Sequence, residues 1–313
     1  MTRQPRNQAG DGHITIALAA YNRADTIEEA VRSLLSQTYR NFDLYAIDDA
    51  STDGTLEVLL KLLPEDERLH VIHLEKNRGT YSAKNLILRD YCKGEFYAHQ
   101  DADDISWERR LEKQVAYLRE NRQAAACGTG VDEFFKTKKD FPGTPSHYPV
   151  TFDSKDGFYH RKNIYPPLFR QGACFGMDTT GIGTLKVAKN GSLLYRTKAI
   201  KQLGGFDGRV QGAADTELLL RLLVFHDLGN LQELLYSRRF HAGSITRSSE
   251  FGHQSEFRIS YLNRAWERIQ ELKPYYDAGD WNQLRTETTQ DLYVAESPFQ
   301  LYESDSRHPV LIG

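Results

Sequence analysis

The sequence predicts an α/β protein with a mostly parallel, doubly wound sheet and helices on both faces. Short apolar runs alternate with segments of helical periodicity between residues 14 and 118, and turn-forming polar residues separate them. This alternation is typical of repeated strand–helix–strand units. The 313 residues are 40% hydrophobic and 27% charged, so the chain is long enough and apolar enough for one large domain with a sizeable core.

The first elements can be predicted one by one. The apolar run ITIALA at 14–19 suits a buried strand, and apolar side chains then recur at helical spacing over 25–37, where Asp25 and Glu28 are expected to form a capping pair. Further strands are expected at 42–47, 70–74 and 95–99, and further helices at 56–63, 80–92 and around 111–118.

The second half of the chain is less regular. Residues 136–183 are rich in Gly, Pro, Tyr and Lys and show little periodicity, so we expect an irregular, substrate-facing loop there. The tail to residue 313 is ambiguous. Between the loop and the tail, strands are expected at 192–196 and 231–240, and helices at 198–203, 215–225 and 256–272.

Composition and charge exclude several classes of protein. The 40 Lys and Arg residues against 43 Asp and Glu give a net charge of −3, which argues against a nucleic-acid partner. No apolar run approaches the roughly 20 residues of a membrane span, and the polar segment 1–12 does not resemble a signal peptide, so we expect a cytoplasmic protein. Cys92, Cys127 and Cys174 have no CxxC spacing, and we expect reduced, buried thiols.

Two acidic clusters follow predicted strands. Asp48 and Asp49 end the second strand, and residues 101–104 (DADD) end the fourth. Because ligands of such sheets bind at the carboxyl ends of the strands, both clusters should face one crevice. Asp101 and Asp103 form an Asp-x-Asp pair that suits Mg²⁺ or Mn²⁺ bound to a diphosphate. The alternative is a solvated turn and helix cap without a ligand.

Two common nucleotide-binding motifs are missing from the sequence. The first strand leads into AAYNRAD without a GxGxxG, which argues against a dehydrogenase, and no GxxxxGK[ST] loop occurs anywhere. A sugar nucleotidyltransferase also binds a nucleotide and a metal on an α/β sheet. It would require a basic, Gly-rich loop after the first strand, and Arg23 alone does not form one.

The order and spacing of several segments resemble a known family, the family 2 glycosyltransferases, which have the GT-A fold. Their nucleotide-sugar-binding half resembles YNRADTIEEAVRSLLSQTY, FDLYAIDDASTDGT, NRGTYSAKN, GEFYAHQDADD and WERRLEKQ, and their acceptor half resembles GSLLYRTKAIKQLGGFDGRV, AADTELLLRLL and YSRRFHAGSIT. The resemblance covers residues 14–246. It implies a donor-binding half at 13–135 after the polar leader 1–12, an acceptor-binding and catalytic half of the same domain at 136–247, and a helical C-terminal extension at 248–313.

The resemblance implies a nucleotide-sugar donor. A carboxylate at the end of the second strand can accept a hydrogen bond from uracil, which suggests a UDP-sugar. Lys84 stands where the family more often has Arg and would face the diphosphate as a point charge, the alternative being a surface lysine. Arg247, on a nearby loop, could cover the diphosphate or be solvated. The full donor-binding set implied is Ala20, Tyr21, Asn22, Asp48, Asp49, Lys84, Asp101, Ala102 and Arg247.

The implied metal ligands are Asp101, Asp103 and His241, for Mn²⁺ or Mg²⁺. A neutral imidazole is an acceptable ligand for Mn²⁺, although a single histidine is often only structural. Asp215 corresponds to the family's general base towards the acceptor hydroxyl, with a helix N-cap as a compatible role. Ala214 departs from the pattern, because many members have Glu there. Glu217 lies about 200° further around a helix and is not expected to replace it.

The activity implied is an inverting, metal-dependent single displacement from a nucleoside-diphosphate sugar to a hydroxyl of a glycan or lipid-linked acceptor. Such enzymes resemble those of bacterial capsule and lipopolysaccharide synthesis, at the inner face of the membrane. A catalytically silent nucleotide- or carbohydrate-binding module is the alternative from another class, with the missing Glu at 214 in its favour. The transferred hexose or N-acetylhexosamine, peripheral membrane association and self-association stay open.

Overall fold

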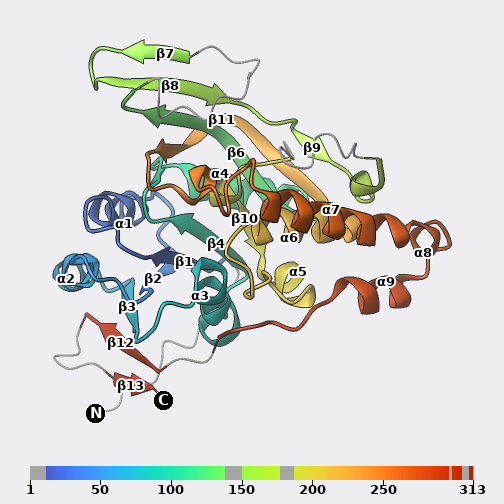
Figure 1. Cartoon of the computed structure of the whole chain (residues 1–313), viewed down its shortest axis with the longest axis horizontal. Helices are drawn as coiled ribbons and strands as arrows, with labels where there is room; N and C mark the ends of the chain where they lie inside the picture. Colours follow the sequence, from blue (N-terminus) through green and yellow to red (C-terminus); the bar gives the residue numbers. More distant parts are fainter. Residues whose placement is uncertain (1–11, 138–149, 177–186, 296–297, 305–309, 313) are drawn as a thin grey trace.

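The computed structural model describes residues 12–137, 150–176, 187–295, 298–304 and 310–312. Apart from Gly12, the predicted polar leader lies outside these residues, as do parts of the predicted irregular loop. Figure 1 shows a central twisted sheet with helices on both faces, as the sequence predicts.

Four parallel strands form the centre of the sheet in the order β3-β2-β1-β4. In β1, side chains are buried along nearly the whole strand, as expected where helices cover both faces. The register places Ile14 of β1 opposite Phe42 and Phe96. The four strands are β1 (Ile14–Ala20), β2 (Phe42–Asp48), β3 (Leu69–Leu74) and β4 (Phe96–Asp101).

Two apolar clusters show how the helices divide between the two faces. One cluster packs side chains of α1, α2 and α4 against Ile16 and Leu44, and the other packs α3, α5 and α6 against Ala17 and Ile47. A π-helical turn at Ile87–Tyr91 continues α3, so the predicted single helix at 80–92 changes its hydrogen bonding midway. The helices are α1 (Ile27–Leu35), α2 (Thr55–Leu62), α3 (Thr80–Leu86), α4 (Arg110–Glu120), α5 (Thr197–Gln202) and α6 (Ala214–Phe225).

The start of α1 differs from the predicted capping pair. Thr26 occupies the N-cap position, and no side chain caps the helix. Its hydroxyl instead donates to the carbonyl oxygen of Ala102 at 3.0 Å. This hydrogen bond joins the first turn of α1 to the acidic turn after β4.

The sheet continues from β4 into the second half of the chain. β10 (Leu194–Arg196) runs antiparallel between β4 and β6 (Ala124–Phe135). The long β11 (Asp227–Phe240) pairs parallel with β6, and β5 (Ile105–Ser106) pairs with β11. β6 was not predicted, because Gly128 and Gly130 interrupt its apolar pattern.

Part of the predicted irregular loop forms strands. β7 (Val150–Asp153) and β8 (Phe158–Asn163) make a hairpin on the edge of β6, and β9 (Leu168–Phe169) pairs with β11. The prediction of irregular structure is wrong for these segments. VTFD does alternate apolar and polar residues, but its four residues are too short a run to stand out in the sequence.

The C-terminal extension is helical as predicted over α7 (Glu256–Glu271), α8 (Lys273–Asp277) and α9 (Trp281–Thr288). The chain then returns to the far edge of the sheet, where β12 (Phe299–Glu303) pairs antiparallel with β3 and with β13 (Val310–Ile312). Neither of these two strands was predicted. Among the described residues, no helix combines the length and apolarity that crossing a membrane requires. The three cysteines are buried and free.

Candidate active site

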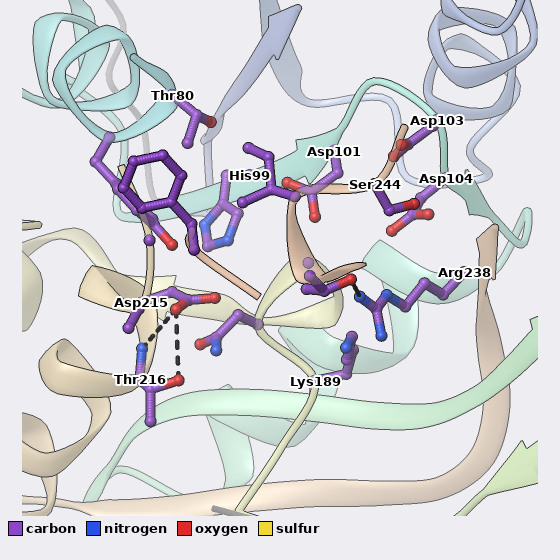
Figure 2. Close-up of a pocket in the computed structure, with 18 of the residues that line it drawn as sticks. Thr80, His99, Asp101, Asp103, Asp104, Lys189, Asp215, Thr216, Arg238 and Ser244 are labelled. Atoms are coloured by element: carbon purple, nitrogen blue, oxygen red, sulfur yellow. Dashed lines mark hydrogen bonds between the residues drawn. The ribbon is translucent and has the colours of Figure 1, made fainter. Parts of the chain in front are cut away.

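A cavity of about 1410 Å³ opens at the carboxyl ends of the central strands. Residues from both halves of the chain line it, among them Ala20, Asp49 and Asp101 from the first half and Asp215 from the second. Figure 2 shows the carboxylates of Asp101, Asp103 and Asp104 on one side of this cavity and Asp215 on the other. The parallel sheet therefore brings residues together that lie far apart in the sequence.

The loops after β1 and β2 build one wall. Asn22 adopts a left-handed backbone with φ of 52°, and its side-chain oxygen accepts from the backbone N–H of Thr52 at 2.8 Å. Asp49 accepts from the N–H groups of Arg78 and Gly79 at 2.7 and 2.8 Å. Burial nonetheless raises the pKa of Asp49. The predicted donor residues Ala20, Tyr21, Asn22 and Asp49 all line the cavity.

Asp48 has different surroundings from those predicted. Its side chain is fully buried, and one carboxylate oxygen lies 2.7 Å from Nδ1 of His73 on β3. The other oxygen accepts from the N–H of Ser51 at 3.3 Å. Asp48, the last residue of β2, therefore supports the loop, whereas Asp49 lines the cavity just after the end of the strand.

Lys84 is not a surface lysine. Only 4% of its side chain is exposed, and its ammonium donates to Oδ1 of Asp101 at 3.0 Å. Although protein surrounds Asp101, 49% of its side chain is exposed to the cavity. Burial favours the neutral acid, but the Lys84 charge outweighs it and holds the pKa of Asp101 below its usual value. Asp101 is therefore an ionised carboxylate facing the cavity.

Asp103 is joined to the second half of the chain. Nε2 of His241 lies 2.8 Å from Oδ2 of Asp103, and Nε of Arg23 lies 3.6 Å from the same oxygen. Asp103 lines the cavity, whereas His241 is not among the residues that line it. Within the described part of the chain, no group of three His, Cys, Asp or Glu side chains is assembled for a metal. The predicted ligands instead form two pairs, Lys84–Asp101 and His241–Asp103.

The donor set at the acidic turn still fits a divalent cation chemically. Asp101 is ionised, Asp103 borders the same cavity, and both are hard oxygen ligands of the kind that Mg²⁺ and Mn²⁺ prefer. Asp104 differs from them, since it accepts from the hydroxyl of Tyr236 at 2.7 Å and the N–H of Arg239 at 2.9 Å. Burial and the carboxylates of Asp103 and Asp101 raise the pKa of Asp104 well above its usual value.

Asp215 lies in the first turn of α6 and lines the cavity. Its Oδ1 accepts from the N–H of Thr216 at 2.8 Å, as the dashed lines in Figure 2 show. The N-cap position belongs to Ala213, so Asp215 is not the N-cap that the sequence suggested as a compatible role. Burial and the Asp215 carboxylate raise the pKa of Tyr81, which keeps that hydroxyl protonated beside it.

Glu217 does not reach this site. Its carboxylate is bound by Arg221 on the next turn of α6 at 2.6 and 2.7 Å. Arg221 also donates to the carbonyl oxygen of Gly205 at 2.8 Å. Glu217 therefore stabilises the turn before α6 through Arg221. This agrees with the expectation that Glu217 does not replace a Glu at position 214.

Several residues of the cavity were missed by the sequence argument. Lys189 and Arg238 lie at its floor, between Asp215 and the acidic turn (Figure 2). Arg238 donates to Glu133 at 3.3 Å and to the hydroxyl of Thr246 at 2.9 Å. The pair Arg238-Arg239 inside an apolar strand could have indicated these residues, because buried charges are rare without a functional or structural partner.

The C-terminal extension also contributes to the cavity. Its lining residues come from the start of α7 and the loop before it, whereas Arg247 is exposed at the end of the turn Ile245–Arg247 and does not line the cavity. The extension therefore forms part of the site. These lining residues are Phe251, His253, Gln254, Arg258, Ile259 and Asn263.

Comparison with known sequences identifies relatives of this chain. Residues 15–180 match the profile of the family described as Glycosyl transferase family 2. EpsE of Bacillus subtilis (strain 168), which carries the name of a glycosyltransferase, is 30% identical over 244 residues, or 75% of this chain and 76% of EpsE. TuaG of the same organism, named for teichuronic acid biosynthesis, is 35% identical over 130 residues, which cover 39% of this chain and 51% of TuaG.

Solved structures share the architecture at low sequence identity. Residues 1–349 of S. aureus TarS in complex with UDP-GlcNAc superpose with a TM-score of 0.56 at 17% identity, covering 88% of this chain and 90% of that one. The mannosyltransferase PcManGT from Pyrobaculum calidifontis, in complex with GDP-Man and Mn²⁺, gives 0.55 at 17% identity, covering 91% and 76%. These likenesses confirm the predicted fold, and the sequence relatives establish that the chain belongs to glycosyl transferase family 2.

Proposed function

We propose that this chain transfers a sugar from a UDP-sugar to a hydroxyl group of a glycan or lipid-linked acceptor, with inversion at the anomeric carbon. The observation that carries the proposal is that one cavity holds the acidic turn with Lys84 on one side and Asp215 on the other. The family of the chain supports it, as do the UDP-GlcNAc and GDP-Man bound to the two structural relatives.

The donor occupies the side of the cavity formed by the central strands. Asp49 and the loop at Ala20–Asn22 receive the nucleoside, and the ammonium of Lys84 faces the diphosphate. Asp101, Asp103 and His241 would hold Mn²⁺ or Mg²⁺. When bound, the metal supplies positive charge that stabilises the departing diphosphate.

Asp215 acts on the acceptor. Its carboxylate takes the proton of the acceptor hydroxyl while that oxygen forms a bond to the anomeric carbon, and the bond from this carbon to the diphosphate breaks on the opposite face. The negative charge leaves on the nucleoside diphosphate, beside Lys84. One displacement of this kind inverts the anomeric configuration. The sugar is a hexose or N-acetylhexosamine, and the product belongs to a bacterial surface polysaccharide made at the inner face of the membrane.

Calorimetric titration of UDP with and without Mn²⁺ tests the donor site. The wild type should bind UDP more tightly with Mn²⁺, and Asp103→Ala should remove most of this gain. Asp90→Ala is the matched control, since it removes an exposed carboxylate whose partner is the neighbouring Arg89 at 2.7 Å. No UDP binding under either condition, or equal binding by wild type and Asp103→Ala, would contradict the proposal.

A further inference from the structure

Three cationic side chains lie near one partly buried histidine, His253, in the cavity. Burial and the charges of Lys189, Arg258 and Arg238 lower the pKa of His253 to about 3, so its imidazole is neutral. Lys189 comes from the loop before β10, Arg238 from β11 and Arg258 from α7. All four residues line the cavity. We call these four residues the cationic floor.

The carboxylates near the cationic floor already have partners among the described residues. Glu133 accepts from Arg161 at 2.7 Å as well as from Arg238 at 3.3 Å, so one carboxylate serves two guanidinium groups. Asp215 faces the floor, and its carboxylate accepts from the N–H of Thr216. The guanidinium of Arg258 donates to the hydroxyl of the same Thr216 at 3.2 Å. Asp101 and Asp103, which also act on the charge of Arg238, pair with Lys84 and His241.

Two polar atoms of the floor have no partner among the described residues. Nε of Arg258 and Nδ1 of His253 are buried without a hydrogen bond. Buried polar groups are almost always hydrogen-bonded, because leaving one unpaired costs about 1–3 kcal/mol. Unpaired donors on a cationic surface indicate that a ligand supplies the missing acceptors.

We propose that the cationic floor binds an anionic group, a phosphate or a carboxylate, carried by the acceptor. The donor diphosphate has its own cation in Lys84, which donates to Asp101 at 3.0 Å. Lys189 and Arg238 lie between the acidic turn and Asp215 (Figure 2), and Arg258 connects to Asp215 through Thr216. An anion held there brings the rest of the acceptor next to the proposed base. This inference rests on the proposed function, because only a transferase binds an acceptor.

The test titrates inorganic phosphate and, separately, glucuronate into the full chain already saturated with UDP and Mg²⁺. Both anions should bind to the wild type in a saturable way, and the tighter of the two identifies the group. Lys189→Met keeps the length of the side chain and removes its charge, so affinity should fall about tenfold or more, as expected for a charged hydrogen bond. Lys162→Met, an exposed position of β8 that does not line the cavity, should leave the affinity unchanged.

Several results would overturn the subsite. The first is no saturable binding of either anion, and the second is equal binding by wild type and Lys189→Met. The third is anion binding that UDP abolishes, because this would place the anion in the donor site. Arg258→Met provides a second variant if Lys189→Met does not fold. Failure of the proposed function is recognised separately: a chain that binds phosphate through Lys189 but never binds UDP contradicts the donor assignment and leaves the anion site intact.

Discussion

Replacing Lys189 by methionine should stabilise the folded protein at neutral pH, although it removes a charged residue from the cavity. Burial and the nearby Arg238 lower the pKa of Lys189 from its usual 10.5 to about 8, because both disfavour the ammonium. Methionine has a similar length and is readily buried in irregular spaces.

The size of the effect follows from the two pKa values. A difference of about 2.5 between the unfolded and folded states, at about 1.36 kcal/mol for each pH unit, gives an upper limit of about 3 kcal/mol. Part of the Lys189 side chain is reached by solvent, so we expect about 1–3 kcal/mol. The unfolded chain binds the additional proton between pH 8 and 10.5, so the wild type gains stability relative to the variant over this interval.

Chemical denaturation of both proteins at several pH values measures this difference. The variant should be more stable by a constant amount below pH 8, and its advantage should shrink to nothing as the pH approaches 10.5. Lys162→Met, with an exposed side chain, should show no such pattern. A Lys189→Met protein that is less stable than the wild type at pH 7, or an advantage that does not vary with pH, would refute the reasoning.

Three further substitutions have expected outcomes. Asp104→Asn should not lower the free energy of unfolding at pH 7 in denaturation by urea, because burial and the carboxylates of Asp103 and Asp101 disfavour the charged form of this side chain; a loss above about 2 kcal/mol would contradict this. Lys84→Met should weaken UDP binding about tenfold or more in calorimetry. The substitution also raises the pKa of Asp101, so the variant should lose its remaining UDP binding at a higher pH than the wild type when the solution is acidified. Asp48→Asn should leave UDP affinity within about twofold while destabilising the fold by about 1 kcal/mol, because its carboxylate pairs with His73.

The central fold was predictable because its signals are local. Each of the four central strands is a short apolar run followed by a turn and a helix, and the prediction of their positions differs from the structure by a residue or two. β6 was missed because glycines interrupt its apolar pattern, and β7 was missed because its four residues are too short a run to stand out. β12 was missed for another reason: its place on the edge of the sheet depends on β3, which lies far away in the sequence.

The candidate site was predictable where motifs follow strands and not where the chain folds back. The sequence placed Asp49, Asp101 and Asp103 at one crevice, and the cavity contains them. It could not show that Asp48 turns towards His73, since the choice between two adjacent carboxylates depends on where β2 ends. The cationic floor was also out of reach, because three distant segments assemble it.

The rate at which UDP is released from UDP-sugars, with water as the acceptor, tests the central claim most directly. The wild type and Asp215→Asn should be compared with Mn²⁺ over UDP-glucose, UDP-galactose and their N-acetyl forms, after calorimetry has shown that both proteins bind UDP equally. If Asp215 takes the proton of the attacking hydroxyl, the rate with the preferred donor should fall by about 10²–10⁴-fold in the variant. Equal rates for the two proteins would contradict the assignment of Asp215 as the base and, with it, the proposed mechanism.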